Sequence, residues 1–423
     1  MAGKGKRMKV LFVINSNYPY ESTGTNLLNK LLYEGGLLDK LETVDVLGGK
    51  ESYFDKDFEK SGKINVYKAW AWTTLPKEEI KKVFIRNPLG AIGGCFIKIY
   101  GKALSISSRQ RFADLLTYKA FYKMLKKIHA DKYDIIVAIS GRYYQSIAAS
   151  RYCKEKKINF ILYQVDPCRT NQSMPEKTLH IRRKIEKQLY ENAKLVITTP
   201  IIFKEWKQNK DENDKSAVVS MEFPLITKLK EEPGKRKKMT DKRVCMFVGS
   251  IYGGIRDPEY TIRLFEKLGK QENVELQFIG VKTEDLPVKL RLLGVKCQGK
   301  IPVEEAFAKM QQADFLVNIG NSVENQVPSK IFDYISTGKP IINICKSRKC
   351  PSLVYLERYP LCLNLYEEAS IFEKQVVILK EFINSQKVEK LDFEYIEKLY
   401  KECTPIYCAN FIYEKFKEMM REK

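Results

Sequence analysis

Short hydrophobic runs alternate with amphipathic segments along most of the chain. In the first half, the hydrophobic runs predict strands at residues 9–14, 43–47, 64–69, 134–139, 159–164, 195–199 and 217–221. Between several of these runs, hydrophobic positions recur three and four residues apart, which predicts helices at residues 25–33, 113–128, 145–156 and 181–192. Strands that are hydrophobic on both faces and separated by helices are typical of a parallel sheet covered by helices on both sides.

The same alternation restarts in the second half. Its hydrophobic runs predict strands at residues 244–249, 274–280, 314–320, 340–345 and 361–365, with a weaker one near Val295. The helical spacing predicts helices at residues 259–268, 303–312 and 328–337, and two more near the end of the chain, at 370–385 and 410–421. The second half is therefore also expected to be a doubly wound α/β domain.

Residues 227–243 separate the two halves, because no hydrophobic position recurs there and basic residues outnumber acidic ones. We interpret this stretch as an interdomain linker between an N-terminal domain at 1–226 and a C-terminal domain at 244–400. Residues 401–423 would form a helix that crosses back to the first domain. A solvated connector explains the linker charge better than a nucleic-acid surface does, because no aromatic residues are interleaved for base stacking. Nucleic acid is therefore not expected as a partner.

The stretch QVPSKIFDYISTGKPII carries the clearest local signals for a ligand site. Pro328 suits the start of a helix and Gly338 its end, so a short helix should follow one buried strand and precede the next. Ser329 and Lys330 would lie at its amino end, where unpaired N–H groups favour anions. Lys330 is suited to a phosphate and Asp333 to a ribose diol. The alternative is an ordinary exposed ion pair between these two side chains.

The net charge and the cysteine spacing limit the expected partners and the expected cellular compartment. Lysine and arginine number 74 and aspartate and glutamate 52, which gives a net charge of +22 and favours acidic partners. Charge alone does not choose among phosphorylated substrates, anionic lipid and nucleic acid, and the linker composition argues against nucleic acid. The ten cysteines lack the short paired spacings of a zinc site, which predicts reduced thiols in a cytoplasmic protein. No secretory signal pattern and no hydrophobic run of about 20 residues is visible.

Two α/β domains joined by a linker predict a central cleft that suits a nucleotide-linked substrate. The ordered set FVGSIYGGIRDPEYTIRLF, LQFIG, QGKIPVEEAFAKMQQADFLVNIGNS and PSKIFDYISTGKPII resembles the nucleotide-sugar domain of the group 1 glycosyltransferases, family 4. The first half resembles the family more loosely, through KVLFVINSNYPYESTGTNLLNKLL, YDIIVAISGRYYQSIAASRYCKEKKINFILYQVDP and KIEKQLYENAKLVITT. The resemblance implies a GT-B fold, in which two Rossmann-like domains face a central cleft, and a hexosyltransferase-like enzyme.

The resemblance also implies roles for residues of the second domain. The family has two acidic residues with seven residues between them, and these positions hold Asn325 and Asp333 here. Asp333 would contact the ribose, and Asn325 keeps hydrogen bonding near the donor sugar but lacks the charge. Arg256 matches the diphosphate-binding arginine, whereas Thr261 stands where a partner lysine is usual, so Lys330 would supply that charge.

Two glycines complete the donor side of this expected site. Gly253 and Gly254, which precede Arg256, would allow close backbone approach to a phosphate. Cationic groups aimed at the diphosphate stabilise the leaving group in the transition state, so neither a cofactor nor a metal is expected. The alternative for Arg256 is a surface arginine paired with Asp257 or Glu259.

The acceptor side is expected in the first domain. Asp166, which follows a strand in YQVDP, would orient the acceptor hydroxyl, and its alternative is a turn residue. Gly24 and Thr25, at the start of a helix, would face the cleft from the same side. His129 and His180 are expected to be ordinary helix residues. The resemblance implies a retaining transfer without a protein nucleophile.

The resemblance implies an acceptor that is a glycan or is carried on lipid, as in the synthesis of cell-surface polysaccharide or glycoconjugates. A segment that the resemblance does not cover mixes aromatic and basic residues, which suits the surface of an anionic membrane, at its inner face. These residues are Trp70, Trp72, Lys81, Lys82, Phe84, Arg86, Phe96, Lys98, Tyr100 and Lys102. The alternative is a helix pair over the core.

Two other functions stay open. A nucleotide-sugar epimerase of similar fold would convert the donor without an acceptor. A basic, noncatalytic GT-B protein would bind ligands without turnover, and the departures at Asn325 and Thr261 favour it. Product formation separates the three functions.

Overall fold

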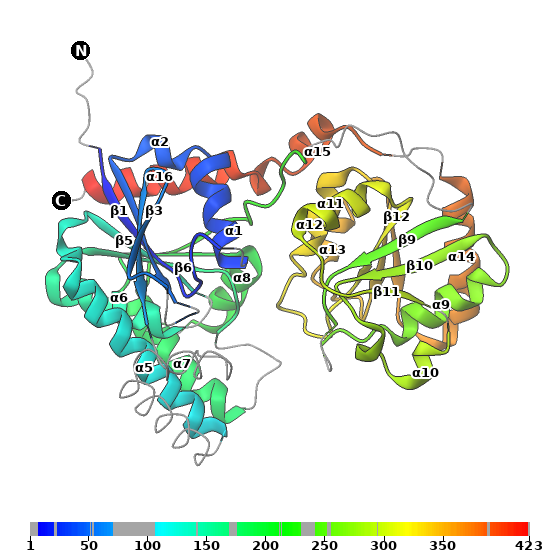
Figure 1. The fold of residues 1–423 in the computed structure, drawn as a ribbon, viewed down its shortest axis with the longest axis horizontal. Coiled ribbons are helices and arrows are strands. Elements are labelled where there is room, and N and C mark those ends of the chain that lie inside the picture. Colours follow the sequence, from blue (N-terminus) through cyan, green and yellow to red (C-terminus); the bar gives the residue numbers. More distant parts are fainter. Residues whose placement is uncertain are drawn as a thin grey trace. The chain divides into compact units, whose positions relative to one another are not determined.

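The chain forms two compact units in the computed structural model (Figure 1). The structure describes residues 7–20, 23–50, 52, 55–70, 106–140, 143–168, 176–210, 212, 214–229, 242–251, 255–293, 295–386 and 390–421. Unit 1 comprises residues 1–224 and 405–423, and unit 2 comprises residues 225–404.

Unit 1 is built on an eight-stranded sheet with the order β3-β4-β2-β1-β5-β6-β7-β8. The strands are β1 (Lys9–Val13), β2 (Thr43–Gly49), β3 (Phe58–Ser61), β4 (Ile64–Ala69), β5 (Ile135–Ser140), β6 (Asn159–Gln164), β7 (Leu195–Thr198) and β8 (Val218–Ser220). All neighbouring strands are parallel except β3, which is antiparallel to β4. Parallel strands need crossover connections, and helices supply them.

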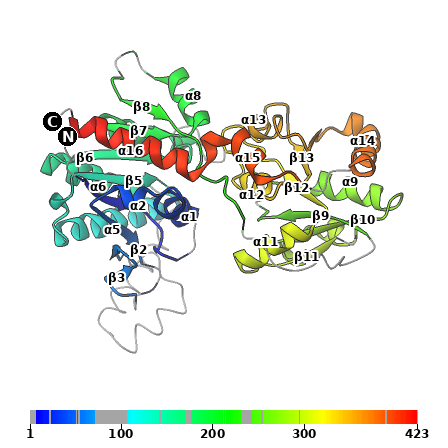
Figure 2. The ribbon, with the colours of Figure 1, turned by 90° about the horizontal axis from the view of Figure 1, so that it is seen from above.

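Helices cover both faces of this sheet and bury a hydrophobic layer on each. The helical elements are α1 (Thr23–Asn29), the π-helix η1 (Lys30–Glu34), α2 (Leu37–Lys40), α5 (Ile106–Lys127), η3 (Ala130–Lys132), α6 (Tyr143–Lys156), α7 (Glu176–Asn192), α8 (Pro200–Asn209) and α16 (Pro405–Arg421). One layer includes side chains of α1, η1 and α16, and the other includes side chains of α5, α6, α7 and α8. Figure 2 shows α16 running along unit 1, although it comes from the far end of the chain.

Unit 2 is built on a six-stranded, fully parallel sheet with the order β11-β10-β9-β12-β13-β14. Its strands are β9 (Arg243–Val248), β10 (Val274–Ile279), β11 (Lys296–Gln298), β12 (Phe315–Ile319), β13 (Ile341–Cys345) and β14 (Cys362–Tyr366). Its helices are α9 (Glu259–Gly269), η4 (Thr283–Asp285), α10 (Val288–Arg291), α11 (Val303–Gln312), α12 (Lys330–Thr337), α13 (Leu353–Leu356), η5 (Ala369–Ile371), α14 (Phe372–Ser385), α15 (Phe393–Leu399) and η6 (Lys401–Cys403). Side chains of α9 and α14 pack on one face, and Figure 1 shows α11, α12 and α13 on the other.

The chain passes between the units at two places. It enters unit 2 between Pro224 and Leu225, just before the predicted linker, and returns to unit 1 between Thr404 and Pro405. The Thr227 N–H donates to Ser336 Oγ of α12 at 3.2 Å, so the first residues of the predicted linker are bound to unit 2. Residues 230–241 of that linker lie outside the described residues.

The sequence predictions of strands are confirmed to within about two residues at each end, and the alternation of strands and helices is that of the structure. Several elements of unit 1 were not predicted, among them α2, β3, η3 and α8. The antiparallel strand β3 (FEKS) is half exposed, and α8 (PIIFKEWKQN) follows β7 directly. The predicted start of α5 was seven residues late, at 113 where the helix begins at Ile106.

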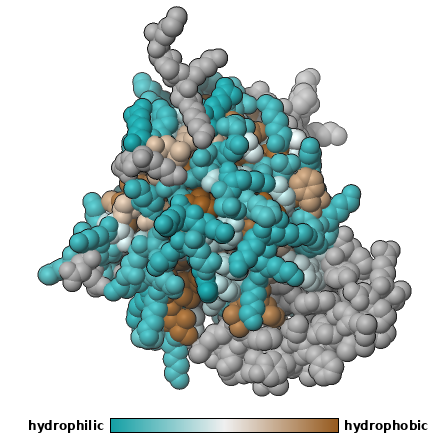
Figure 3. Space-filling view, turned by 90° about the vertical axis from the view of Figure 1, so that its left-hand side faces the viewer, coloured by the Kyte–Doolittle hydropathy of each residue, from teal (hydrophilic) through white to brown (hydrophobic). Residues whose placement is uncertain are grey.

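Hydrophilic residues dominate the described surface of unit 1 in Figure 3, and hydrophobic residues form small separate spots there. None of the helices among the described residues is both long and hydrophobic enough to cross a membrane. Apart from Trp70, the residues predicted to meet an anionic membrane lie outside the described residues.

Candidate functional site

The strand order of unit 2 reverses between β9 and β12. Residues Cys245 and Met246 of β9 pair with Phe315 and Leu316 of β12, and each strand then runs on toward its carboxyl end. In open α/β sheets, ligands bind outside the carboxyl ends of the strands at such a reversal. The loops after β9 and β12 are therefore the first place to look for a site.

A tyrosine from α12 binds the end of β9. The Val248 N–H donates to Tyr334 Oη at 2.8 Å, and Tyr334 Oη donates to the Val248 carbonyl at 3.1 Å. The Tyr334 side chain is fully buried, and burial raises its pKa, so the phenol stays protonated and keeps its donor. The last residue of β9 is thus fixed to α12 through both of its main-chain polar groups.

Arg256 lies buried between the loops that follow β9 and β12. Its Nε and Nη2 donate to Asn321 Oδ1 at 3.2 and 2.9 Å, and its Nη1 donates to the Ser250 carbonyl at 3.2 Å. Arg256 is 9% exposed and Asn321 is 6% exposed. A cation is therefore held at the reversal point largely out of contact with solvent.

Main-chain contacts join the same two loops. The Ser322 N–H donates to the Ile255 carbonyl at 2.7 Å, and Asn321 Nδ2 donates to the Gln326 carbonyl at 3.0 Å. Gly320, which precedes Asn321, has no room for a side chain, because a Cβ there would lie 2.9 Å from both Cys350 Sγ and the Ile344 carbonyl. The position of Asn321 is therefore set from both sides.

The predicted helix after β12 is present as α12. Its end before Gly338 is confirmed, and it begins at Lys330, two residues after the predicted start at Pro328. Ser329 is the N-cap residue and Lys330 the first helical residue. Gly338 ends the helix in the left-handed conformation with φ +77°, and its N–H donates to the Ile335 carbonyl at 3.0 Å. The inward face of α12 is hydrophobic and fully buried.

Lys330 and Asp333 form an ion pair, with 2.8 Å between Lys330 Nζ and Asp333 Oδ2. Their side chains are 36% and 21% exposed, and Lys330 Nζ also lies 5.7 Å from the centre of the Phe307 ring. This is the ordinary ion pair that was the alternative to a ligand site. Partly exposed ion pairs of this kind stabilise the folded state by roughly 0.2–1 kcal/mol. The roles of both residues toward a ligand stay predictions.

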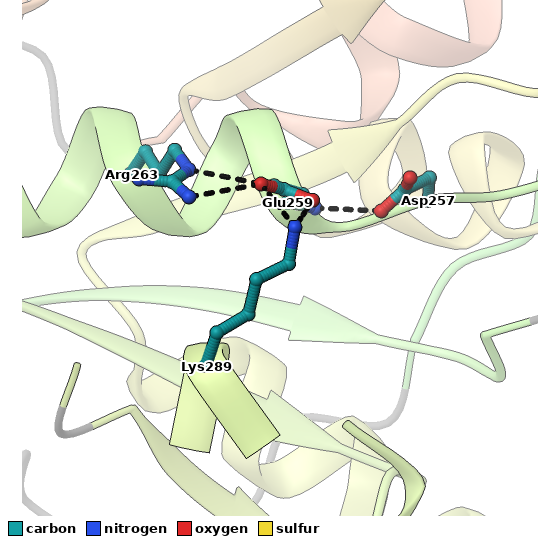
Figure 4. A network of polar contacts seen from close by, with 4 residues as sticks. All are labelled: Asp257, Glu259, Arg263 and Lys289. Carbon is teal, nitrogen blue, oxygen red and sulfur yellow. Dashed lines mark hydrogen bonds and ion pairs between the residues drawn. The ribbon is translucent and has the colours of Figure 1, made fainter. Parts of the chain in front are cut away.

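The alternative for Arg256 was a surface arginine paired with Asp257 or Glu259, but these two residues make other contacts. Glu259 accepts from Arg263 Nε and Nη2, both at 3.0 Å, and from Lys289 Nζ at 2.7 and 2.8 Å (Figure 4). Asp257 Oδ1 accepts from the N–H of Glu259, the first residue of α9, at 2.9 Å. The hydrogen bonds from Lys289 and then Arg263 lower the pKa of Glu259. Arg256 itself is buried and bonded to Asn321.

The other residues discussed for the nucleotide-sugar donor lie in the loop after β12, at the start of α12 and on α9. Asn325 is buried at 5% exposure in the loop after β12, and Ser329 is exposed. Thr261 is 1% exposed on the buried face of α9. Gly253 and Gly254 lie outside the described residues.

In unit 1 the strand order reverses between β1 and β5. Gly24 and Thr25 lie in the first turn of α1, which follows β1, and Thr25 is fully buried. Asp166 follows β6, one strand further from the reversal, and is partly exposed. Its main-chain carbonyl accepts from Tyr143 Oη at 3.4 Å and from Gln164 Nε2 at 3.2 Å.

A buried carboxylate supports the turn that contains Asp166. Gln164 Nε2 also donates to Glu186 Oε1 of α7 at 2.9 Å, and Gln164 and Glu186 are 0% and 2% exposed. Glu186 was missed by the sequence analysis, as were Asn321 and Tyr334 of unit 2. The signal for Asn321 was its place in the polar turn after a buried strand. Tyr334 lies within PSKIFDYISTGKPII, but among the buried residues of α12, and Glu186 lies within a helical pattern that marks no function.

Among the described residues, no group of three histidine, cysteine, aspartate or glutamate side chains is arranged to hold a metal ion. No protein-family model matches the sequence, and the comparison with curated proteins gives no match.

Solved structures match the fold over nearly the whole chain. Sucrose-phosphate synthase from Thermosynechococcus elongatus is similar with a TM-score of 0.66 and 15% identity, covering 98% of this chain and 100% of that one. A UDP-forming α,α-trehalose-phosphate synthase from Burkholderia xenovorans gives 0.58 and 12%, covering 98% and 99%. HepE from Anabaena, in complex with UDP and glucose, gives 0.61 and 12%, covering 97% and 100%. The predicted fold class, GT-B with two Rossmann-like units, is confirmed.

Proposed function

We propose that the protein transfers a sugar from a nucleotide-sugar donor to a glycan or lipid-linked acceptor. The observation that carries the proposal is the buried cation Arg256 at the point of unit 2 where the strand order reverses. An anionic, phosphate-containing ligand is the natural partner of a cation held at the carboxyl ends of parallel strands.

The structural neighbours support a donor in which the sugar is carried on uridine diphosphate (UDP). One of them is described as UDP-forming, and others are described as bound to UDP or to UDP-2-fluoro glucose. We propose the same donor class for this chain. The full coverage of both chains supports the proposal, because it extends the likeness to both units.

Each proposed role follows from charge. In the reaction, the bond between the anomeric carbon and the diphosphate oxygen breaks, its electron pair stays on that oxygen, and the anomeric carbon bonds to the acceptor oxygen. Arg256 and Lys330 would stabilise the negative charge that grows on the diphosphate. The departing phosphate oxygen becomes basic as the bond breaks and would take the acceptor proton, without a metal.

The remaining roles concern orientation. Asp333 would accept hydrogen bonds from the ribose, and Asn325 would contact the donor sugar. On unit 1, the Asp166 carboxylate would orient the acceptor hydroxyl near the turn at Gly24 and Thr25. Transfer with retention of the anomeric configuration is part of the proposal, as is a pathway that makes cell-surface polysaccharide or glycoconjugates.

The first experiment is thermal unfolding of the purified protein with UDP, GDP and the corresponding nucleotide sugars. Ligand at 100 times its Kd stabilises the native state by about 2.7 kcal/mol. For a unit of the size of unit 2, this free energy corresponds to roughly 5–10 °C. We expect UDP and UDP-sugars to give such a shift.

Substitutions locate the ligand. Lys330→Ala and Asp333→Ala should each reduce the shift, because one removes a phosphate contact and the other a ribose contact. Lys415→Ala is the matched control, because Lys415 forms the same i,i+3 ion pair with Glu418 on α16 of unit 1. No shift with any nucleotide would contradict the proposal, and an equal shift in all variants would exclude α12 as the donor site.

Product analysis separates transfer from the alternatives. Release of free UDP together with a glycosylated acceptor supports the proposal. Interconversion of UDP-sugars without an acceptor would identify an epimerase, and nucleotide binding without any product in an acceptor screen would favour a noncatalytic protein.

The membrane part of the proposal concerns the segment with Lys81, Lys82 and Arg86. Replacement of these three residues by glutamate should abolish sedimentation with anionic liposomes, because it reverses the charge that faces the lipid. Unchanged sedimentation would exclude this segment as the membrane contact.

A further inference from the structure

Asn321 accepts two hydrogen bonds from Arg256 and comes from a different strand end. Its Oδ1 accepts from both Nε and Nη2 of Arg256, at 3.2 and 2.9 Å, so the two-pronged contact fixes the plane of the guanidinium group. Its Nδ2 is fixed by the Gln326 carbonyl at 3.0 Å, which also settles which end of the amide faces Arg256. Both side chains are more than nine-tenths buried.

The chemistry of this partner matters as much as its position. A carboxylate would hold the guanidinium with the same two-pronged geometry, but it would cancel the positive charge. An amide oxygen accepts the same hydrogen bonds and carries no net charge. Because burial removes most of the screening by water, the charge of Arg256 acts strongly on a phosphate that approaches this loop.

We infer that Asn321 is a positioning residue that holds Arg256 for the diphosphate while leaving its charge intact, an inference that rests on the proposed function. Asn321 thereby sets a specificity: the site favours nucleoside diphosphates over monophosphates, and both over the nucleoside. The free energy of this preference comes from the attraction between the charge of Arg256 and the phosphates. Asn321 orients the guanidinium group without neutralising its charge.

Two substitutions of Asn321 separate charge from structure. Asn321→Asp keeps an acceptor oxygen at the place of Oδ1, replaces the donor Nδ2 by a second oxygen and adds a negative charge. Asn321→Ala removes the acceptor and adds no charge. Both variants lose the hydrogen bond to the Gln326 carbonyl. They differ in the acceptor for Arg256, which only Asn321→Asp keeps, and in charge, so weaker UDP binding by Asn321→Asp can only come from the charge. Circular dichroism and the unfolding temperature without ligand establish that each variant is folded.

The measurement is the Kd of UDP, UMP and uridine for each variant by titration calorimetry, at two salt concentrations. We expect Asn321→Asp to weaken UDP binding by about tenfold or more, UMP binding by less, and uridine binding not at all. Asn321→Ala should weaken UDP binding less than Asn321→Asp does. The salt dependence of UDP binding should become smaller in Asn321→Asp, because the net attraction is lost.

A matched control is available within unit 2. Asn384 accepts from Arg243 Nη1 at 3.4 Å through its Oδ1 and is exposed. Asn384→Asp adds the same charge to the same unit beside another arginine, so it corrects for the change in net charge. Its Kd for UDP should stay within about twofold of the wild-type value, since exposed charges are strongly screened.

The outcomes distinguish this inference from the proposed function. If wild-type protein binds no nucleotide, both are overturned. Two outcomes would leave the proposed function standing and overturn the inference. In one, Asn321→Asp binds UDP as tightly as the wild-type protein does. In the other, Asn321→Ala binds UDP more weakly than Asn321→Asp does. A uniform loss of UDP, UMP and uridine binding in both variants would show a purely structural role and would also overturn it.

Discussion

One phenol holds together the part of unit 2 where β9 and β12 reach their carboxyl ends. Tyr334 reaches from α12 to both main-chain polar groups of Val248. These groups are buried, and a buried donor or acceptor without a partner costs free energy. The residue that begins the loop toward Arg256 is therefore positioned by a side chain.

We expect Tyr334→Phe to lower the free energy of unfolding of unit 2 by about 1–3 kcal/mol, because the buried N–H and carbonyl of Val248 lose their partner. Urea denaturation followed by circular dichroism measures this change. Tyr260→Phe is the control, because its phenol makes a contact of 3.5 Å with the Glu368 carbonyl in a partly exposed setting. Equal effects of the two substitutions would contradict the role given to Tyr334.

The sequence indicated Arg256 but not its partner. Arg256 was recognised through a family resemblance of the loop that follows a predicted strand. Asn321 lies 65 positions away, in the turn after another strand. Only the strand order brings the two turns together, and the order of strands in a sheet cannot be read from hydrophobic spacing. Glu186 and Gln164 lie on consecutive elements, and their contact was missed because helical spacing does not show which polar side chain of α7 is buried.

At the scale of elements, α12 owes its ends to local sequence and its packing to tertiary structure. Gly338 combines both, because its backbone has φ +77° and a Cβ at this position would lie 2.3 Å from the Leu391 carbonyl oxygen. The first property suits glycine and is tolerated by asparagine. The second excludes every residue with a side chain unless the backbone moves.

This difference gives a test by two substitutions. Gly338→Ala should destabilise unit 2 by more than the roughly 1–2 kcal/mol of the left-handed conformation alone. Gly338→Asn should not restore stability, because its Cβ meets the same carbonyl oxygen. Melting temperatures of both variants measure this effect, and near-wild-type stability of Gly338→Asn would show that only the backbone conformation matters.

Periodicity located most elements because the strands of both sheets are buried on two faces and therefore read as hydrophobic runs. It failed where that condition does not hold. The edge strand β3 exposes Phe58 and carries Glu59 and Lys60, so its letters resemble a loop. The start of α5 was also missed, since its first two turns, ISSRQRF, have few hydrophobic positions.

At the scale of the whole molecule, the two ends of the chain share one core. Cys408, Ile412 and Phe416 of α16 are buried against the strands and helices of unit 1. Unit 1 is therefore complete only when the chain has passed through all of unit 2. Substitutions in α16 should act on unit 1, and ligands of the donor site should act on unit 2.

Phe416→Ala should destabilise unit 1 by about 3–5 kcal/mol, because it empties a fully buried position. Differential scanning calorimetry with UDP should then show a lowered transition for unit 1 and a UDP-stabilised transition for unit 2. Ile406→Ala, on an exposed position of α16, is the control and should change stability by no more than about 0.5 kcal/mol. A loss of UDP stabilisation in Phe416→Ala would contradict the assignment of the donor site to unit 2.

The most direct test of the account is the affinity for UDP of wild-type protein, Arg256→Ala and Arg263→Ala by titration calorimetry. Arg263 is the matched control, because it is an exposed arginine of α9 that is paired with Glu259. Loss of a charged hydrogen-bonded contact costs about 1.5–3 kcal/mol, so we expect Arg256→Ala to weaken UDP binding by roughly 10- to 150-fold. Arg263→Ala should bind UDP as the wild type does. If Arg256→Ala binds UDP with wild-type affinity, the diphosphate does not lie at Arg256 and the account of the site is wrong.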